Sequence, residues 1–501
     1  MLVTYLYSWN ITRYPTTNRF LTMFLNNLQH ELMAFRRDRW ALLVIVLFFG
    51  LTFFALRNGE QMVVERQHAI DKELHLMDSL DTALAAEITA IEENRKAPPK
   101  ESWLDPRSLW VLARDAPRVI AMQPQPLALV ATGQSDLFPH VIKPKIYGES
   151  YRLGFSELAN PVQLLFGTFD LAFVCIYLLP LLVLALSYNV LSSDKELGIL
   201  SLTASQPVSL YRWLLQKLLV RFLLLGIIVT VAILAGLGLQ GVSLIGNVAS
   251  LLKLMVAVLV YMAFWFGVAF AVNLMGKPSG TNAITLVALW LGIVLFIPAI
   301  IAQTTTTLNP VPSRVNMIHE YREAQSEARE NADKIMDAYY RDHPELAVQN
   351  ESQENPYGFM FGYFASASVI NKAVGPVLDA YNQALARQQA WVNQLKVLSP
   401  ALLLQQVFSQ TAGTTAAHYT DFRKQVIDFT EIWKDYFKPR MFAGESLRAE
   451  DIPQLPRYQY SARQVPDIYS ELILVLSFFL LLVGGVSFLV YQAKKAQLVV
   501  A

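Results

Sequence analysis

The residues with the clearest chemical potential lie in a short polar segment between two apolar runs. This segment is Ser192-Ser-Asp-Lys-Glu-Leu-Gly-Ile-Leu-Ser-Leu-Thr-Ala-Ser-Gln-Pro-Val-Ser209. Its carboxylates, Asp194 and Glu196, are strong hydrogen-bond acceptors. A charged hairpin of this length that contains a proline is too short to form a domain. It is long enough to be bound by a domain of another protein. We therefore expect non-covalent docking to a separate protein rather than covalent catalysis.

The motifs of nucleotide hydrolysis and covalent catalysis are missing from the sequence. No Gly-x-x-x-x-Gly-Lys-Ser/Thr loop occurs, because Gly276-Lys277 is followed by Pro278 and lacks the upstream glycine. His-Glu-x-x-His and Gly-x-Ser-x-Gly are absent as well. His68 and His75 share a helix face, but two ligands at this spacing are a weak basis for a metal site. We expect no enzyme active site, no metal and no cofactor in this chain.

The composition is typical of a protein with several membrane spans. Of the 501 residues, 54% are hydrophobic and only 16% are charged, whereas soluble domains carry about 25% charged residues. The mean hydropathy is +0.34. The net charge of +1 gives no reason to expect binding to nucleic acid. The single cysteine, Cys175, lies in an apolar run, so neither a disulfide framework nor a cysteine-based zinc site is available.

Six stretches are long enough to cross a bilayer, which requires about 20 apolar residues per helix. They are Trp40–Leu56, Leu164–Tyr188, Leu214–Leu239, Val248–Met275, Ile284–Ala302 and Ile468–Tyr491. If the spans alternate, the basic residues that flank them fall on one side, which the positive-inside tendency makes cytoplasmic. These residues are Arg36, Arg37, Arg39, Lys195, Arg212, Lys277, Lys494 and Lys495. We therefore expect both termini in the cytoplasm.

This topology predicts an all-α polytopic membrane protein with two largely helical extracytoplasmic insertions. The expected parts are a cytoplasmic N-terminus (1–39), the first span (40–56), a first outer domain (57–163), the second to fifth spans with the polar hairpin at 189–213 (164–302), a second outer domain (303–467), the sixth span (468–491) and a cytoplasmic tail (492–501). The insertions are too long to be ordinary loops, so they are expected to fold.

Hydrophobic periodicity predicts the helices of the insertions. In the first, Val63, Ile70, Met77, Leu84 and Ile91 recur every seven residues and predict a long helix with one apolar seam. The second insertion has two helical stripes, made of Ile318, Tyr321, Ala328, Ile335 and Tyr339, and of Val374, Leu378, Tyr381, Leu385, Val392 and Leu395. The seams are either intramolecular core or a partner-binding surface. The short apolar runs 119–122 and 127–131 could be strands.

Two further groups of residues are functional candidates. An amphipathic helix is expected in the cytoplasmic interface before the first span, where it is either a connecting helix or a plain anchor. Its apolar residues are Leu21, Leu25, Leu28, Leu32 and Phe35. The polar candidates inside the apolar runs are Asp170 and Asn273. A buried Asp170 would indicate a function, whereas a second span beginning near Thr168 would make it an ordinary interfacial residue.

The polar segment carries a family resemblance. The run Asp194-Lys-Glu-Leu-Gly-Ile-Leu-Ser-Leu-Thr-Ala-Ser-Gln-Pro-Val-Ser209, followed by Leu214-Leu-Gln-Lys217, resembles the signature of ABC-2 type permeases. In that signature an acidic-x-Gly-Thr-Leu run leads to a Pro-Val-Ser-like turn, and Ile199 replaces the usual threonine. The runs Asn160-Pro-Val-Gln-Leu-Leu-Phe-Gly-Thr-Phe-Asp170 and Leu398-Ser-Pro-Ala-Leu402 look like the branch related to copper-enzyme-maturation permeases with large periplasmic insertions.

The resemblance implies a half-transporter with the fold of a type-2 ABC exporter. Two such subunits, either two copies of this chain or this chain and a sister permease, would face each other in the lipids of a bacterial inner membrane. Each would couple to a cytoplasmic ABC ATPase, which would hold the ATP and Mg²⁺. The resemblance places the ATPase contact at Asp194, Glu196, Gly198, Gln206, Pro207, Val208 and Ser209. It places the connecting helix at residues 21–35.

The function that the resemblance implies is ATP-driven export or extrusion of a substrate. The size of the outer segments keeps a second function open, mechanotransmission, in which the ATPase moves an outer stalk that acts on a periplasmic partner. A scaffold or channel without an ATPase is a third, and the hairpin argues against it because a passive channel needs no docking element. No Met-rich or His-rich tract supports copper as the substrate.

Overall fold

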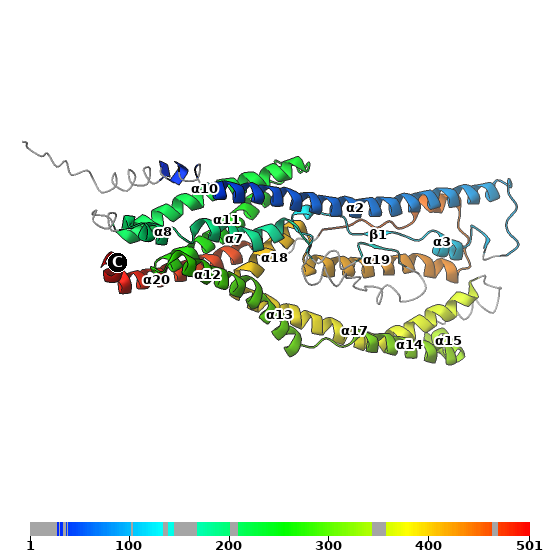
Figure 1. Ribbon diagram of the computed structural model, residues 1–501. Helices are drawn as coiled ribbons and strands as arrows, with labels where there is room; N and C mark the ends of the chain where they lie inside the picture. The colour runs from blue at the N-terminus through cyan, green and yellow to red at the C-terminus, as the bar shows by residue number, and fades with distance from the viewer. Residues whose placement is uncertain are drawn as a thin grey trace, which may run out of the picture. The chain divides into compact units, whose positions relative to one another are not determined.

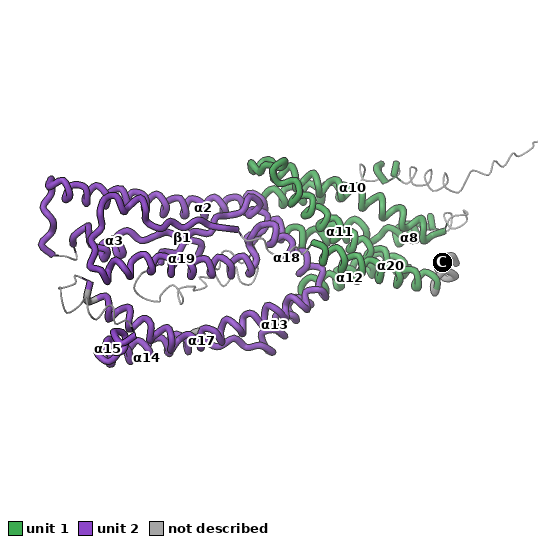
Figure 2. The backbone as a smooth tube through the Cα atoms, turned by 180° about the vertical axis from the view of Figure 1, so that it is seen from behind, with its two compact units in different colours: residues 1–54, 174–295, 469–501 green, residues 55–173, 296–468 purple. Residues whose placement is uncertain are grey.

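The computed structural model shows an almost entirely helical protein made of two compact units. It describes residues 28–29, 31–33, 37, 39–101, 104–133, 139–144, 168–200, 209–342, 357–462 and 469–500. Unit 1 comprises Met1–Phe54, Val174–Leu295 and Tyr469–Ala501, and unit 2 comprises Ala55–Phe173 and Phe296–Ile468 (Figure 2). The two long insertions of the sequence therefore share one unit.

Six helices in the described part of the chain are long and apolar enough to cross a membrane, as the sequence predicts. They are Arg39–Glu92, Leu171–Glu196, Leu210–Leu239, Val248–Asn273, Ser279–Leu308 and Tyr469–Gln492. The expected residues 164–167 of the second span lie outside the described residues. The fifth helix begins earlier than expected, at Ser279, directly after a proline. This pattern is that of a multi-pass membrane protein.

Unit 1 is a bundle around helix α11 (Val248–Asn273). This helix packs against α7 (Leu179–Ser187), α10 (Leu210–Leu239), α12 (Ser279–Trp290) and α20 (Tyr469–Val500), which lie side by side in Figure 1. Its buried aromatic residues are Tyr261, Phe264, Trp265, Phe266 and Phe270, of which Tyr261 and Trp265 are fully buried. All of these helices are apolar on most faces, as expected where lipid surrounds the bundle.

The second span is irregular near its start, and α11 stabilises the irregularity. The α-helix α6 (Leu171–Phe173) passes into the π-helix η4 (Val174–Leu178) before α7. Pro180 has no backbone N–H, so it cannot donate to the carbonyl of Ile176 four residues earlier. The Tyr261 hydroxyl donates to that carbonyl instead, at 3.0 Å. A proline and a π-turn are the common causes of a helix kink.

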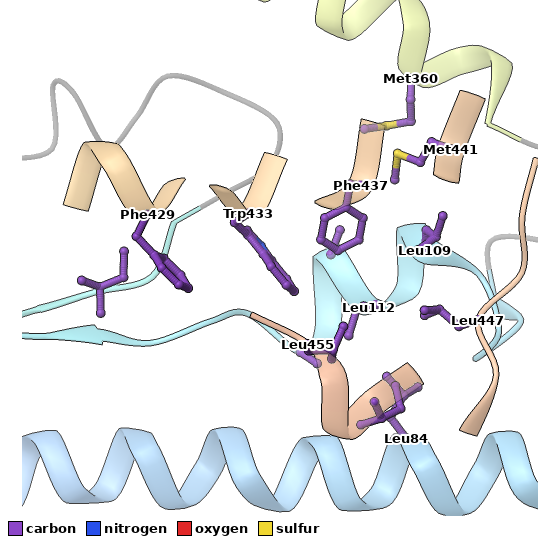
Figure 3. Close-up of a cluster of buried hydrophobic side chains, with 14 of the residues drawn as sticks. Leu84, Leu109, Leu112, Met360, Phe429, Trp433, Phe437, Met441, Leu447 and Leu455 are labelled. Carbon is purple, nitrogen blue, oxygen red and sulfur yellow. The ribbon is translucent and has the colours of Figure 1, made fainter. Parts of the chain in front are cut away.

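Unit 2 is built on the continuation of the first membrane helix. Helix α2 (Arg39–Glu92) runs 54 residues without a break, from unit 1 into unit 2. Of the predicted seam, Ile70, Met77, Leu84 and Ile91 are buried and Val63 is half-buried. The core around Leu84 includes α3 (Leu109–Asp115) and α19 (Ala416–Phe442), whose Trp433 and Phe437 point into the cluster that Figure 3 shows.

One of the two predicted strands forms. Strand β1 (Ile120–Ala121) pairs antiparallel with β2 (Val141–Ile142), with Ile120 opposite Ile142. The run from residue 127 contains instead the 3₁₀-helix η2 (Ala128–Val130), so the second strand prediction is wrong. The tight 3₁₀ turn brings the Leu129 backbone against Gly59 of α2, a close approach that a glycine allows.

The second insertion forms a helical hairpin and then returns to the core. Helices α14 (Arg314–Glu330) and α15 (Ala332–Asp342) pack on the long α17 (Gly358–Leu395). Ala324 and Ala328 meet Ile370 and Val374 between α14 and α17. The 3₁₀-helix η6 (Lys396–Leu398), α18 (Pro400–Ala412), α19 and the 3₁₀-helix η7 (Ala449–Gln454) follow.

A hydroxyl group ties the start of α17 to the core of unit 2. The Tyr357 hydroxyl accepts a hydrogen bond from the Leu109 N–H at 3.1 Å and donates to the Glu445 carbonyl at 3.0 Å. Tyr357 and Met360 belong to the same buried cluster as Leu84 and Trp433. The two insertions therefore fold around one hydrophobic core.

Gly59→Ala is expected to destabilise unit 2 by about 1–3 kcal/mol, the usual penalty for overpacking. A Cβ at residue 59 would lie 2.1 Å from the Leu129 carbonyl oxygen, which is backbone and cannot rotate away. Gly50→Ala in the same helix is the matched control, because nothing lies within 4 Å of its Cβ position, and it should leave the melting temperature unchanged or raise it. Thermal unfolding of the two purified variants tests this, and equal melting temperatures would contradict it.

Candidate functional site

The polar hairpin between the second and third spans begins with a short helix, α8 (Ser192–Glu196). Gly198 follows it with φ +71°, a left-handed conformation that favours glycine, and it turns the chain after α8. Ser209 is the exposed N-cap of α10, and its hydroxyl lies 3.4 Å from the Tyr491 hydroxyl. Three of the predicted contact residues, Gln206, Pro207 and Val208, lie outside the described residues.

Glu196 caps the first turn of the fifth span. The N-cap position of α12 is Pro278, whose side chain cannot accept a hydrogen bond from the helix. Oε1 of Glu196 accepts the Ser279 N–H at 2.8 Å, and the Ser279 hydroxyl lies 3.0 Å from Oε2 and 2.8 Å from the Ser192 hydroxyl. A carboxylate at this position also interacts favourably with the positive end of the helix dipole. Helix α8 therefore holds the beginning of α12.

Asp194 connects the same short helix to the third span. Its Oδ2 lies 2.9 Å from the Lys217 ammonium group, and both side chains are mostly shielded from solvent. The Lys217 ammonium also lies over the Trp213 ring, 4.2 Å from its centroid. This cation–π contact and the ion pair together fix the direction of the lysine side chain.

Asn273 joins the fourth span to the turn that precedes α8. It is fully buried, and its Oδ1 accepts the Leu191 N–H at 3.2 Å. Its Nδ2 donates to the carbonyls of Ser187 at 2.9 Å and Ala269 at 2.8 Å. Asn282 of α12 donates in the same way to the Tyr188 carbonyl at 3.3 Å. Polar side chains of this kind hold transmembrane helices together.

The sequence reasoning assigned Asp194 and Glu196 to contacts with a partner, and the structure places both in contacts within unit 1. Within the described residues of the hairpin, two aliphatic side chains are exposed beside Glu196. Leu197 is 69% exposed and Ile199 is 45% exposed, on either side of Gly198. The sequence carried a signal for this surface, because two aliphatic residues flank a glycine in a charged segment.

The expected connecting helix is described only in part. Leu28 is half-buried and Leu32 is exposed, while Leu21, Leu25 and Phe35 lie outside the described residues. Among the described residues of this segment, the buried one is Glu31, which the sequence reasoning missed.

Glu31 forms an ion pair inside unit 1. One of its carboxylate oxygens, Oε2, lies 2.7 Å from Nε of Arg221 in α10, and Arg221 also donates to the Leu186 carbonyl. Arg221 is therefore held within unit 1 by a residue of the segment before the first span. A charge pair that is removed from solvent is costly to break, because the remaining charge stays buried.

Asp170 is the N-cap of the second span and belongs to unit 2. Its Oδ1 accepts the Phe173 N–H at 2.8 Å, and its Oδ2 accepts the Thr132 N–H at 3.0 Å and lies 3.1 Å from the Thr132 hydroxyl. Burial raises the pKa of this carboxyl group, although these hydrogen bonds act in the opposite direction. The contacts give Asp170 a structural role, at the point where the chain enters the second span.

Within the described residues, no three His, Cys, Asp or Glu side chains come together in a way that could hold a metal ion. The arrangement that does emerge is mechanical. Helix α8 and the turn before it are bonded to the third, fourth and fifth spans through Lys217, Asn273 and Ser279. A force on the hairpin would therefore reach three membrane helices.

Asn273→Leu is expected to lower the stability of unit 1 by about 1–2 kcal/mol, the range for interhelical hydrogen bonds in membranes. Leucine branches at the same carbon as asparagine but has no polar atoms, so the substitution removes the partner of the Leu191 N–H. Asn247→Leu, at the other end of the same helix, is the control, because Asn247 makes only an exposed local bond to Ser243. Thermal melts in detergent compare the two, and an equal loss in both would contradict the role of Asn273.

Comparison with known families adds one match. The family described as a domain of unknown function (DUF3526) matches residues 314–461. The matched region begins at α14 and includes α17, α18 and α19, so it lies within unit 2. No curated protein matches the chain, and no solved structure does. The matched residues lie within the second insertion of this chain and include none of the six candidate membrane helices.

Proposed function

We propose that this chain is the membrane subunit of an ABC-2 type transporter, driven by a separate cytoplasmic ATPase to export or extrude a substrate. The observation that carries the proposal is the hairpin that contains α8. It exposes Leu197 and Ile199 directly after α8, and α8 is bonded to the third and fifth spans. A docking element of this kind converts closure of a partner into movement of membrane helices.

In this proposal the chain contributes no ATP site of its own, and ATP and Mg²⁺ bind to the ATPase. The complex contains a second copy of this chain or a sister permease. It lies in the inner membrane of a bacterium with both termini in the cytoplasm, as the basic residues at the ends of the spans favour. Unit 2 is then the periplasmic part, which the two insertions form together.

A second function, mechanotransmission, is favoured by the construction of unit 2. Its core joins α2, which continues from the first span without a break, to the helices that match DUF3526. A large folded unit on continuous helices is suited to moving a periplasmic partner without carrying a substrate across the bilayer.

Affinity purification of the chain from native membranes, with mass spectrometry of the bound proteins, tests the proposal. An ABC ATPase in stoichiometric amount is expected, and its loss in a Leu197→Asp, Ile199→Asp variant would place the contact on the hairpin. An additional periplasmic protein bound in equal amount would favour mechanotransmission. Recovery of the chain without an ATPase, with and without nucleotide, would overturn both functions and favour a channel or scaffold.

A further inference from the structure

We infer that the fifth span is the element that carries movement of the α8 hairpin into unit 2, where it moves the hairpin of α14 and α17. This inference rests on the proposed function, because it assumes that an ATPase moves α8. It assigns a mechanical role to two residues at opposite ends of one helix region, Ser279 and Asn309.

Helix α8 is bonded to two membrane helices. In the described part of the chain, its side chains bond to Lys217 of α10 and to Ser279 of α12. Helix α10 ends at Leu239 and returns through the uncharged turn 240–247 into α11, all within unit 1. The fifth span alone, of these two, continues into unit 2.

The fifth span is continuous from unit 1 into unit 2. Helix α12, the π-helix η5 (Leu291–Phe296) and α13 (Ile297–Leu308) form one helical stretch, Ser279–Leu308. The boundary between the two units falls inside this stretch, between Leu295 and Phe296. Since its backbone stays helical across the boundary, a displacement of its first turn is passed along its axis. The π-turn and Pro298 provide a place where it can bend.

The far end of the fifth span is attached to α17. Helix α13 packs against α17, with Ile301 and Thr305 buried. Beyond its last turn, the Asn309 carbonyl accepts a hydrogen bond from Nε2 of Gln388 in α17, at 2.7 Å. This bond explains the polar Gln388 within the apolar stripe of α17. The chain then enters α14 after Ser313, so the base of the hairpin is attached to α13 both covalently and by packing.

Helix α17 acts as a lever within unit 2. Helix α17 is 38 residues long and begins directly after Tyr357, which is anchored in the core, while Gln388 lies near its other end. A shift of the base therefore tilts α17 relative to α19. Two other elements also enter unit 2. Helix α2 makes no hydrogen bond or ion pair with α8 within the described residues. The second span, which ends with α8, is interrupted by the turn 188–191 and by η4 before it reaches unit 2.

The test uses distances between spin labels within unit 2 of the intact complex. Cys175 is the only cysteine, so Cys175→Ser gives a clean background. Labels are attached at Asp379→Cys on α17 and Asp435→Cys on α19, which are both exposed. Distances are measured in lipid nanodiscs with the co-purified ATPase, without nucleotide and with ATP and vanadate.

We expect nucleotide to shift the distance between the labels, and Gln388→Leu to reduce that shift by more than half. Gln389→Leu is the matched control, because Gln389 is exposed and bonds only within its helix, and it should keep the full shift. Gln388→Ala, which is smaller, should behave like Gln388→Leu. An equal shift in all variants, or no shift while the bound ATPase hydrolyses ATP, would overturn the inference and leave the proposed function standing. Absence of a bound ATPase would overturn both.

Discussion

Replacing Arg118 by alanine is expected to lower the free energy of unfolding of unit 2 by about 3–5 kcal/mol, the range for a buried ion pair that loses one partner. Arg118 is fully buried in the core. Its guanidinium group forms two hydrogen bonds with the Asp81 carboxylate of α2, one of them 2.9 Å long, and a third with the Ala116 carbonyl. It also lies 5.2 Å from the centroid of the Trp433 ring. The alanine variant leaves the Asp81 carboxylate buried with most of its bonds broken.

Arg457→Ala is the control for this prediction. Arg457 pairs with Asp78 at 3.0 Å and with Asp81 at 3.4 Å, but its side chain is 50% exposed. An exposed pair of this kind contributes about 1 kcal/mol or less. Thermal melts of the full chain should therefore show a fall of order 10 °C for Arg118→Ala and a small change for Arg457→Ala. Similar falls in the two variants would show that burial does not determine the energetics of this cluster.

The membrane helices could be predicted because their signal is local. A bilayer requires a run of apolar residues of fixed length, and this requirement is visible without knowledge of any contact. The ends of the helices were harder to predict. The fifth span begins at Ser279 rather than Ile284, because Glu196 from a distant segment caps it. A cap supplied by another element leaves no pattern next to the helix.

The buried face of α2 was predicted more accurately than the buried faces of α14 and α17. The seam of α2 has a strict heptad spacing, so Ile70, Met77 and Leu84 could be identified. In α14 the predicted Ala328 is buried, but Met317 is buried where Ile318 was predicted, and Ile318 is 42% exposed. Both residues are apolar, so only the placement of α17 in the fold determines which of the two is buried. The same holds for Ala384, which is buried beside the exposed Leu385.

The polar contacts of the site could not be predicted from the sequence. Glu31 and Arg221 are 190 positions apart, and Glu196 and Ser279 are 83 apart. No spacing rule joins residues at such separations, and a buried charge looks like any surface charge until its partner is known. The hairpin was identified from its composition, but its carboxylates were assigned to a partner protein because their intramolecular acceptor role depends on the fold.

Glu196→Ala is expected to uncouple the ATPase from unit 2 while leaving the fold intact. The substitution removes the cap of α12, a loss of about 1 kcal/mol in stability. It also removes the bond between α8 and the fifth span, since both carboxylate oxygens contact Ser279. We expect the ATPase to bind and hydrolyse ATP as before. Nucleotide should still change the equilibrium between the two distances that separate the labels on α17 and α19. We expect its effect on that equilibrium constant to be about tenfold smaller, within the usual range of coupling energies.

A substitution on the other side of this contact decides how Glu196 acts. Ser279→Pro removes the N–H that Glu196 accepts and the hydroxyl beside it, but it leaves the hairpin surface unchanged. Proline is well tolerated at the first position of a helix, and the preceding Pro278 has φ −58° and ψ 155°, which suit a residue before proline. If Glu196 acts by holding α12, Ser279→Pro should uncouple the complex as Glu196→Ala does. Uncoupling by Glu196→Ala alone would mean that this carboxylate touches the ATPase, and the route through the fifth span would then need another origin.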